Sequence, residues 1–81
     1  MNYTYFPSGT CSRQIDIEIE NNVIKQVSFT GGCHGNLQGI SQLVQGMKCE
    51  DVISKLEGIR CGYKATSCPD QLAKAIKEAM K

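Results

Sequence analysis

Five cysteines in 81 residues are the most chemically distinctive feature of this chain. Thiolates bind soft metal ions and exchange with disulfides, so such a chain is a candidate for metal binding or redox chemistry. Four cysteines lie outside the segments expected to be helix or strand: Cys11, Cys33, Cys61 and Cys68. Consecutive cysteines of this set have 21, 27 and 6 residues between them, which does not match the close Cys-x-x-Cys pairs of zinc fingers. The pattern predicts one site gathered from several loops, where a cation offsets the repulsion between thiolates.

Two of these cysteines are expected at helix N-termini. Cys33 lies in "TGGCHGN", between a strand and the first expected helix, and Cys68 lies in "KATSCPD", just before the last helix. The exposed amides and the positive dipole end at a helix start favour thiolate over thiol. His34 follows Cys33 and is a reserve ligand, although a histidine in a glycine-rich turn is more often exposed to solvent.

The strands that would position these loops are indicated by residues 15–20, where isoleucine alternates with an acidic residue. This period of two predicts a strand with one buried and one solvated face, followed by a hairpin turn. A three-residue loop at 20–22 would set Ile15 opposite Val27, whereas a two-residue loop would set Ile15 opposite Ser28. We expect the three-residue loop, and a short third strand at residues 3–5.

Three helices are expected after the hairpin. The first has Asn36 as its N-cap and an apolar stripe of Leu37, Ile40, Val44 and Met47. In the second, Cys49 is in phase with Val52, Ile53 and Leu56, which makes this cysteine a core residue. The third begins at Pro69 and buries Leu72, Ile76, Ala79 and Met80. Strands followed by helices predict an α+β domain over residues 1–81, a three-stranded antiparallel sheet with three helices on one face.

Chain length and composition reduce the number of possible functions further. A chain of this size buries only about 60 to 65% of its unfolded surface, so a structural metal would add useful stability. The N-terminus has neither a basic region nor a long apolar run, which predicts a cytoplasmic protein without a membrane anchor. An odd number of cysteines in that reducing compartment argues against structural disulfides. Net charge is +1, without a cluster of basic residues, so nucleic acid is not an expected partner.

The residues Thr66 to Asp70 read TSCPD, and this sequence resembles the signature of TSCPD-domain proteins. These are small bacterial and archaeal proteins that also form a C-terminal module of vitamin B12-dependent ribonucleotide reductases. The resemblance covers essentially the whole chain and extends to a four-cysteine family within the group, with the cysteines at 11, 33, 61 and 68. It implies a ribonucleotide reductase as one candidate partner.

A more distant resemblance is to iron-sulfur cluster scaffolds of the IscU/NifU type, which share the order of cysteine loop, hairpin, glycine-cysteine turn and final cysteine. That likeness implies an IscU/NifU-like fold and iron-sulfur assembly proteins as alternative partners. Two features depart from the scaffolds: Arg13 stands where they carry an aspartate, and "GIRCGYKAT" lacks their Leu-Pro-Pro-Val-Lys segment. Cys61 is then expected to supply a fourth sulfur. A closed four-thiolate site favours zinc first and an iron-sulfur cluster second.

Two functional classes follow from these observations. The first is a small metal-binding module that serves as an accessory or assembly domain. The second is a thiol redox module associated with ribonucleotide reductase. Reductase activity itself is not expected, because 81 residues cannot build the barrel, the nucleotide site and the radical machinery that this reaction requires.

Overall fold

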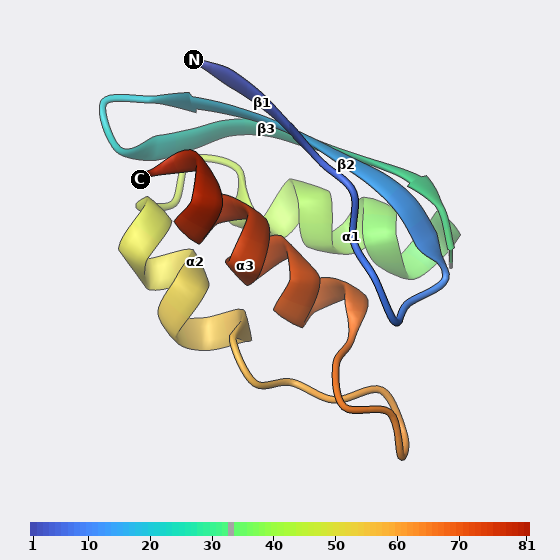
Figure 1. The fold of residues 1–81 in the computed structure, drawn as a ribbon. Helices are drawn as coiled ribbons and strands as arrows, with labels where there is room; N and C mark the ends of the chain where they lie inside the picture. Colours follow the sequence, from blue (N-terminus) through green and yellow to red (C-terminus); the bar gives the residue numbers. More distant parts are fainter. Residues whose placement is uncertain (33) are drawn as a thin grey trace.

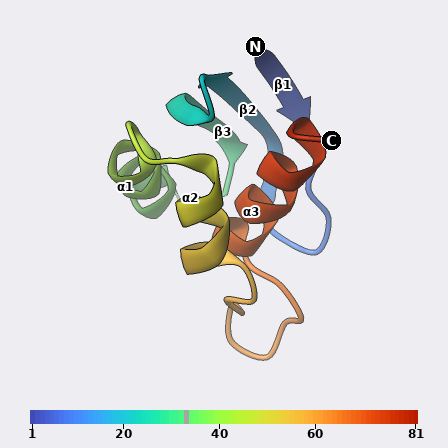
Figure 2. The same ribbon diagram turned by 90° about the vertical axis from the view of Figure 1, so that its left-hand side faces the viewer.

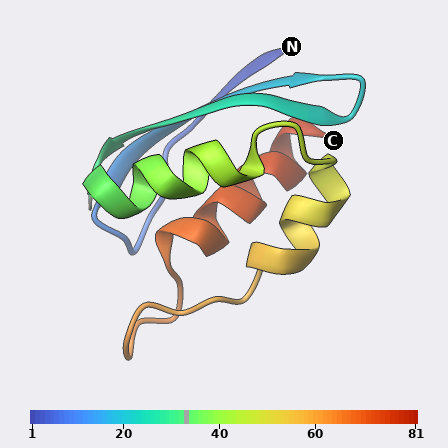
Figure 3. The ribbon, with the colours of Figure 1, turned by 180° about the vertical axis from the view of Figure 1, so that it is seen from behind.

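A three-stranded sheet and a layer of three helices make up the fold in a computed structural model that describes residues 1–32 and 34–81, with the backbone alone described for His34 (Figure 1). The strands and helices are, in chain order, β1 (Asn2–Tyr5), β2 (Ser12–Glu20), β3 (Val23–Gly31), α1 (His34–Val44), α2 (Cys49–Leu56) and α3 (Cys68–Ala79). The sheet is antiparallel in the order β1-β2-β3. All three helices lie on one face of it, as the view from behind also shows (Figure 3). The predicted α+β architecture is confirmed.

The turn between β2 and β3 differs from our expectation of a three-residue loop. It has two residues, Asn21 and Asn22, with φ of 54° and 66°. Positive φ at both central positions is typical of a type I′ turn, whose twist matches that of the flanking strands. The predicted pairing of Ile15 with Val27 is wrong as well, because Ile15 pairs with Phe29.

A β-bulge explains this pairing. The register shifts between Glu18 and Ile19, where Glu18 pairs with Gln26 and Ile19 pairs with Ile24, so that Lys25 is the extra residue. Ile24 and Val27 are both buried although they are three residues apart. A bulge lets two residues on one strand oppose a single residue on its partner, which restores the inward direction of the next apolar side chain.

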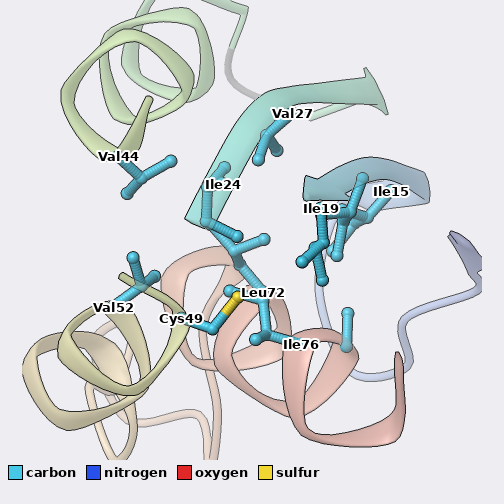
Figure 4. Packing of buried hydrophobic residues seen from close by; sticks show 11 residues of the cluster. Ile15, Ile19, Ile24, Val27, Val44, Cys49, Val52, Leu72 and Ile76 are labelled. Atoms are coloured by element: carbon cyan, nitrogen blue, oxygen red, sulfur yellow. The ribbon is translucent and has the colours of Figure 1, made fainter. Parts of the chain in front are cut away.

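The core lies between the sheet and the helices. The three isoleucines of β2 face inward and are at most 6% exposed, and they pack with Leu72 and Ile76 of α3 (Figure 4). The alternating acidic residues point to the other face, where Glu18 is exposed. An antiparallel sheet with one solvated face requires this arrangement, because buried carboxylates without partners would be costly. The short strand β1 was also predicted, and Tyr3 of β1 pairs with Ile17.

The helix boundaries correct three details. Helix α1 begins at His34, so Asn36 lies within the helix and is not its N-cap. Met47 follows the helix and packs against the core from the connection to α2. Met80 was expected to be buried, but it is 44% exposed because α3 ends one residue earlier.

Among the described residues no helix could cross a bilayer, since the longest has only 12 residues.

The connection between α1 and α2 binds the free edge of β3. Ile24 donates its backbone N–H to the carbonyl of Met47 at 2.8 Å, and Gly46 donates to the carbonyl of Ile24 at 2.7 Å. A single antiparallel bridge also joins Val23 to Lys48. The first residues of this edge strand are therefore covered by the chain itself.

Candidate metal and thiol site

The TSCPD segment connects the loop after α2 to helix α3. Ser67 is the N-cap of α3: its backbone is extended, and its hydroxyl accepts a hydrogen bond of 3.1 Å from the N–H of Asp70. The same hydroxyl donates to the carbonyl of Ile59 at 2.6 Å. Pro69 then occupies the first turn, where its missing N–H costs nothing. Cys68 is consequently the first residue of the helix, one position earlier than the predicted start at Pro69.

Asp70 is a buried carboxylate that holds three chain segments. It is 2% exposed, accepts 2.7 Å and 2.8 Å hydrogen bonds from the Gly58 N–H and the Lys74 ammonium, and also accepts from the Thr66 hydroxyl. Burial alone would raise the pKa of Asp70, but these hydrogen bonds, with that from Gly58 the strongest, lower it to about 2. Asp70 is therefore ionised at neutral pH and closes the base of the loop between α2 and α3.

Cys68 lies among hydroxyl groups. Its sulfur is 3.3 Å from the hydroxyl oxygen of Ser12, which lies 3.2 Å from the hydroxyl oxygen of Thr10. Burial would raise the pKa of the Cys68 thiol, but hydrogen bonds from Ser12, Thr10 and Cys11 lower it below its ordinary value. The start of α3 adds a positive dipole end. These contacts favour the thiolate, the form that binds metals and attacks disulfides.

The Cys11 thiol adjoins both Cys68 and the turn after β3. It contributes to the hydrogen bonding of the Cys68 sulfur and is exposed to solvent. Gly32 packs directly beside it: a Cβ at this position would lie 3.3 Å from the Cys11 sulfur and 2.8 Å from a methyl group of Leu37. Gly32 also has φ of +81°, so both the conformation and the close packing require glycine.

Cys61 lies apart from this pair. It is exposed in the loop between α2 and α3, which projects away from the sheet (Figure 1). Its N–H donates to the carbonyl of Thr66, and its carbonyl accepts from the N–H of Lys64, both at 3.1 Å. Among the side chains of residues 1–32 and 35–81, no three Cys, Asp or Glu residues form a group that could hold a metal ion. The described residues thus bring together two of the predicted ligands, Cys11 and Cys68.

The predictions for Cys33 and for the side chain of His34 lie outside the described residues. Cys49 is fully buried against the core, with its sulfur directed toward Leu72 (Figure 4). Burial, followed by the charge of Glu50, raises the pKa of this thiol, although a backbone hydrogen bond opposes the rise. The prediction that Cys49 is a core residue is confirmed.

Sequence reasoning missed the polar residues that hold the two thiols in place. Ser12 and Thr10 flank Cys11 in the chain, and this adjacency was the available signal. Gln71 is buried, accepts a hydrogen bond of 3.2 Å from the Ser8 N–H, and donates one of 2.9 Å to the Thr66 hydroxyl. It links the loop before Cys11 to the start of α3. A glutamine in a first helical turn gives no sequence signal for this tertiary contact.

This arrangement brings two sulfurs together at a helix N-terminus, one of them activated by hydroxyl groups. Comparison with known protein families matches the TSCPD domain to residues 1–80. Searches of curated proteins and of solved structures gave no match.

Proposed function

This chain belongs to the TSCPD domain family, and we propose that it is a small accessory or assembly module that binds a thiophilic metal. Its ligands are Cys11, Cys33, Cys61 and Cys68, with His34 in reserve. Zinc is the first candidate, since four thiolates form the closed tetrahedral site that structural zinc prefers. An iron-sulfur cluster is the second, because it uses the same ligand set.

The single observation that carries this proposal is the convergence of Cys11 and Cys68. The Cys11 thiol is among the groups whose hydrogen bonding lowers the pKa of the Cys68 thiol, and Ser12, the next residue after Cys11, lies 3.3 Å from the Cys68 sulfur. Gly32, which immediately precedes Cys33 in the chain, packs beside the Cys11 sulfur. Two sulfurs and an adjoining turn that leads to a third cysteine fit a soft metal ion. In this proposal Cys61 supplies the fourth sulfur, and metal binding draws its exposed loop toward Cys11 and Cys68.

The charges near these loops also suit an anionic metal-thiolate site. Residues 58–69 contain no acidic side chain, and Arg60 and Lys64 flank Cys61. Arg13 lies beside the end of β3, since a Cβ at Gly31 would come 3.2 Å from its guanidinium. Four thiolates around a divalent cation carry a net negative charge, which these cations would offset.

Elemental analysis and a UV-visible spectrum of protein purified without oxygen test the proposal. We expect zinc bound stoichiometrically, or the visible absorption of an iron-sulfur cluster, in the wild type and in Cys49→Ala. Cys68→Ser and Cys33→Ser should each lose the metal, because three soft ligands then remain at a site that needs four. Wild-type protein that binds neither zinc nor iron after reconstitution would contradict the proposal.

A dithiol function is the second candidate, and the same pair of sulfurs favours it. The Cys68 thiolate would attack a disulfide of a protein substrate, forming a mixed disulfide and releasing one substrate thiolate. Cys11 would then lose its proton and attack the Cys68 sulfur, which releases the second substrate thiolate and leaves a Cys11–Cys68 disulfide. This exchange transfers two electrons from the Cys11–Cys68 dithiol to the substrate disulfide.

Thiol titration distinguishes the two functions. Closed metal thiolates are protected, so a chelator should raise the number of reactive thiols if metal binding is correct. A dithiol module should instead show the same reactive thiols with and without chelator. It should also lose two thiols per chain on oxidation by a small disulfide, in wild type but not in Cys11→Ser.

A further inference from the structure

Strand β3 has a free edge that is only partly covered. It is the last strand of the β1-β2-β3 sheet, so nothing in the sheet pairs with its other side. Residues 46–49 bind the beginning of that side through Ile24 and through the bridge between Val23 and Lys48. The beginning of this edge is therefore paired with a segment from outside the sheet.

The edge beyond the bulge at Lys25 remains open within the described residues. Ile24 directs both its N–H and its C=O away from β2, toward residues 46 and 47. In an antiparallel ladder the outward-facing residues alternate, so beyond the bulge Val27 and Phe29 direct their backbone groups the same way. Unpaired N–H and C=O groups of this kind are a template for another strand.

A groove of about 340 Å³ follows this open stretch, between β3 and helix α1. Its apolar lining comes from Val27, Phe29 and Leu37, and its polar lining includes Gln38 and Gln42 of α1. None of the residues that line it carries a charge. The groove thus offers backbone partners along one side and an uncharged, partly apolar surface beside them.

We propose that this groove binds an extended peptide segment of a partner protein, which adds to β3 as a fourth strand. The segment would exchange backbone hydrogen bonds with Val27 and Phe29 and continue the pairing that residues 46–49 begin. Every second side chain of the segment would face the groove. Those side chains are apolar or uncharged, because a charge there would be desolvated without a partner.

The position of α1 selects a single peptide segment over a second copy of this chain. Helix α1 lies on the helical face of the sheet, at the side where the free edge of β3 is (Figure 2). Antiparallel pairing of two β3 edges about a two-fold axis would place both copies of α1 on the same face of the joined sheet, at the same seam. The two helices would overlap, whereas a lone strand needs only the spacing of about 4.8 Å between neighbouring strands.

A random heptapeptide library displayed on phage supplies the probe, with the full chain as immobilised target. We expect enrichment of peptides that have apolar residues at alternate positions. Titration of one selected peptide, made synthetically, into ¹⁵N-labelled protein should shift the amide NMR signals of residues 26–31 and 37–42. N-methylation of the inward-facing backbone amides of the peptide should weaken binding by about tenfold or more, because it removes hydrogen bonds to the edge.

Two matched variants test the location. Gln42→Glu places a carboxylate at the groove and should weaken binding several-fold, whereas Gln45→Glu, an exposed residue that does not line the groove, should leave it unchanged. Failure to select any binder, signals that shift elsewhere, or equal binding of the N-methylated peptide would overturn the proposal. Concentration-dependent dimerisation with shifts at residues 26–31 would assign the edge to a second copy instead.

Discussion

The carboxylate of Asp70 accepts a 2.7 Å hydrogen bond from the backbone N–H of Gly58, and this contact joins the two ends of the loop that carries Cys61. Gly58 ends the second helical region with φ of +90°, and Asp70 lies in the first turn of α3. Asp70, the last residue of the TSCPD sequence, therefore serves to close this loop. Its side chain sets where the exposed loop begins and ends.

Replacing Asp70 with Asn should destabilise the fold and change its acid response. The pKa of Asp70 is about 2 in the folded protein, below its ordinary value of 3.8. The ionised carboxylate therefore contributes stability that is fully present above pH 3.8 and is lost as the pH falls through 2. The contribution at neutral pH is roughly 2 kcal/mol, as an upper value. Urea unfolding between pH 2 and pH 7 measures it.

Asp51→Asn is the matched control, because Asp51 is exposed on α2. The Asp51→Asn variant should keep the loss of stability that Asp70 causes as the pH falls through 2, because the hydrogen bonds to Asp70 are unchanged. Equal profiles for Asp70→Asn and wild type would show that the three hydrogen bonds to Asp70 do not act as described.

Gly32→Ala should cost more stability than Gly46→Ala. Both glycines have positive φ, +81° and +88°, so alanine is strained at either position. Only at Gly32 does the added methyl group also meet neighbours, the Cys11 sulfur and Leu37. We expect about 1 kcal/mol for Gly46→Ala and a larger loss for Gly32→Ala, measured by chemical denaturation. Equal losses would mean that the Cys11 and Leu37 side chains move aside for the added methyl group without a cost in stability.

Ser12→Ala should make the Cys68 thiol less reactive at neutral pH. The Ser12 hydroxyl is among the groups that lower the pKa of Cys68, so its removal should raise that pKa and reduce the thiolate fraction. Alkylation of metal-free protein by iodoacetamide between pH 6 and pH 10, with the modified cysteine identified by mass spectrometry, gives the apparent pKa. Ser54→Ala, at an exposed position of α2, should leave it unchanged. A Cys68 curve that does not move in Ser12→Ala would show that this hydroxyl does not stabilise the thiolate.

Cys49→Ala should keep full metal content and lose only about 1 kcal/mol of stability, since it leaves a small cavity in the core. Metal analysis and thermal unfolding provide the two readouts. If Cys49→Ala is purified without metal while Cys61→Ser retains it, the fourth ligand comes from α2 and not from the exposed loop.

Much of the fold follows from local patterns. The alternation of isoleucine with acidic residues predicted which face of β2 is buried, and the Ser-Cys-Pro-Asp run predicted a helix start near Cys68. The hairpin register could not be derived in the same way. It depends on the bulge at Lys25, which forms because the inward residues of β3 are out of phase with a strict period of two.

The candidate site was predictable to a lesser extent. The Cys11 thiol is among the groups that lower the pKa of Cys68, whereas Cys61 lies in an exposed loop, and the cysteine pattern alone did not distinguish these two situations. The contacts of Asp70 with Gly58 and of Gln71 with Ser8 span 12 and 63 residues. Interactions of such separation depend on how the elements pack, and no local pattern encodes them.

The bulge in β3 also bears on how the length of this chain can vary. Without Lys25, strict alternation would place Ile24 inward, Gln26 outward and Val27 inward, which is the arrangement that the bulge already achieves. A chain that lacked this one position would keep Ile24 and Val27 directed inward and form a regular two-residue hairpin. Lys25 is therefore a point in the middle of a strand where a relative could gain or lose a residue, whereas gaps in aligned sequences are usually expected in loops.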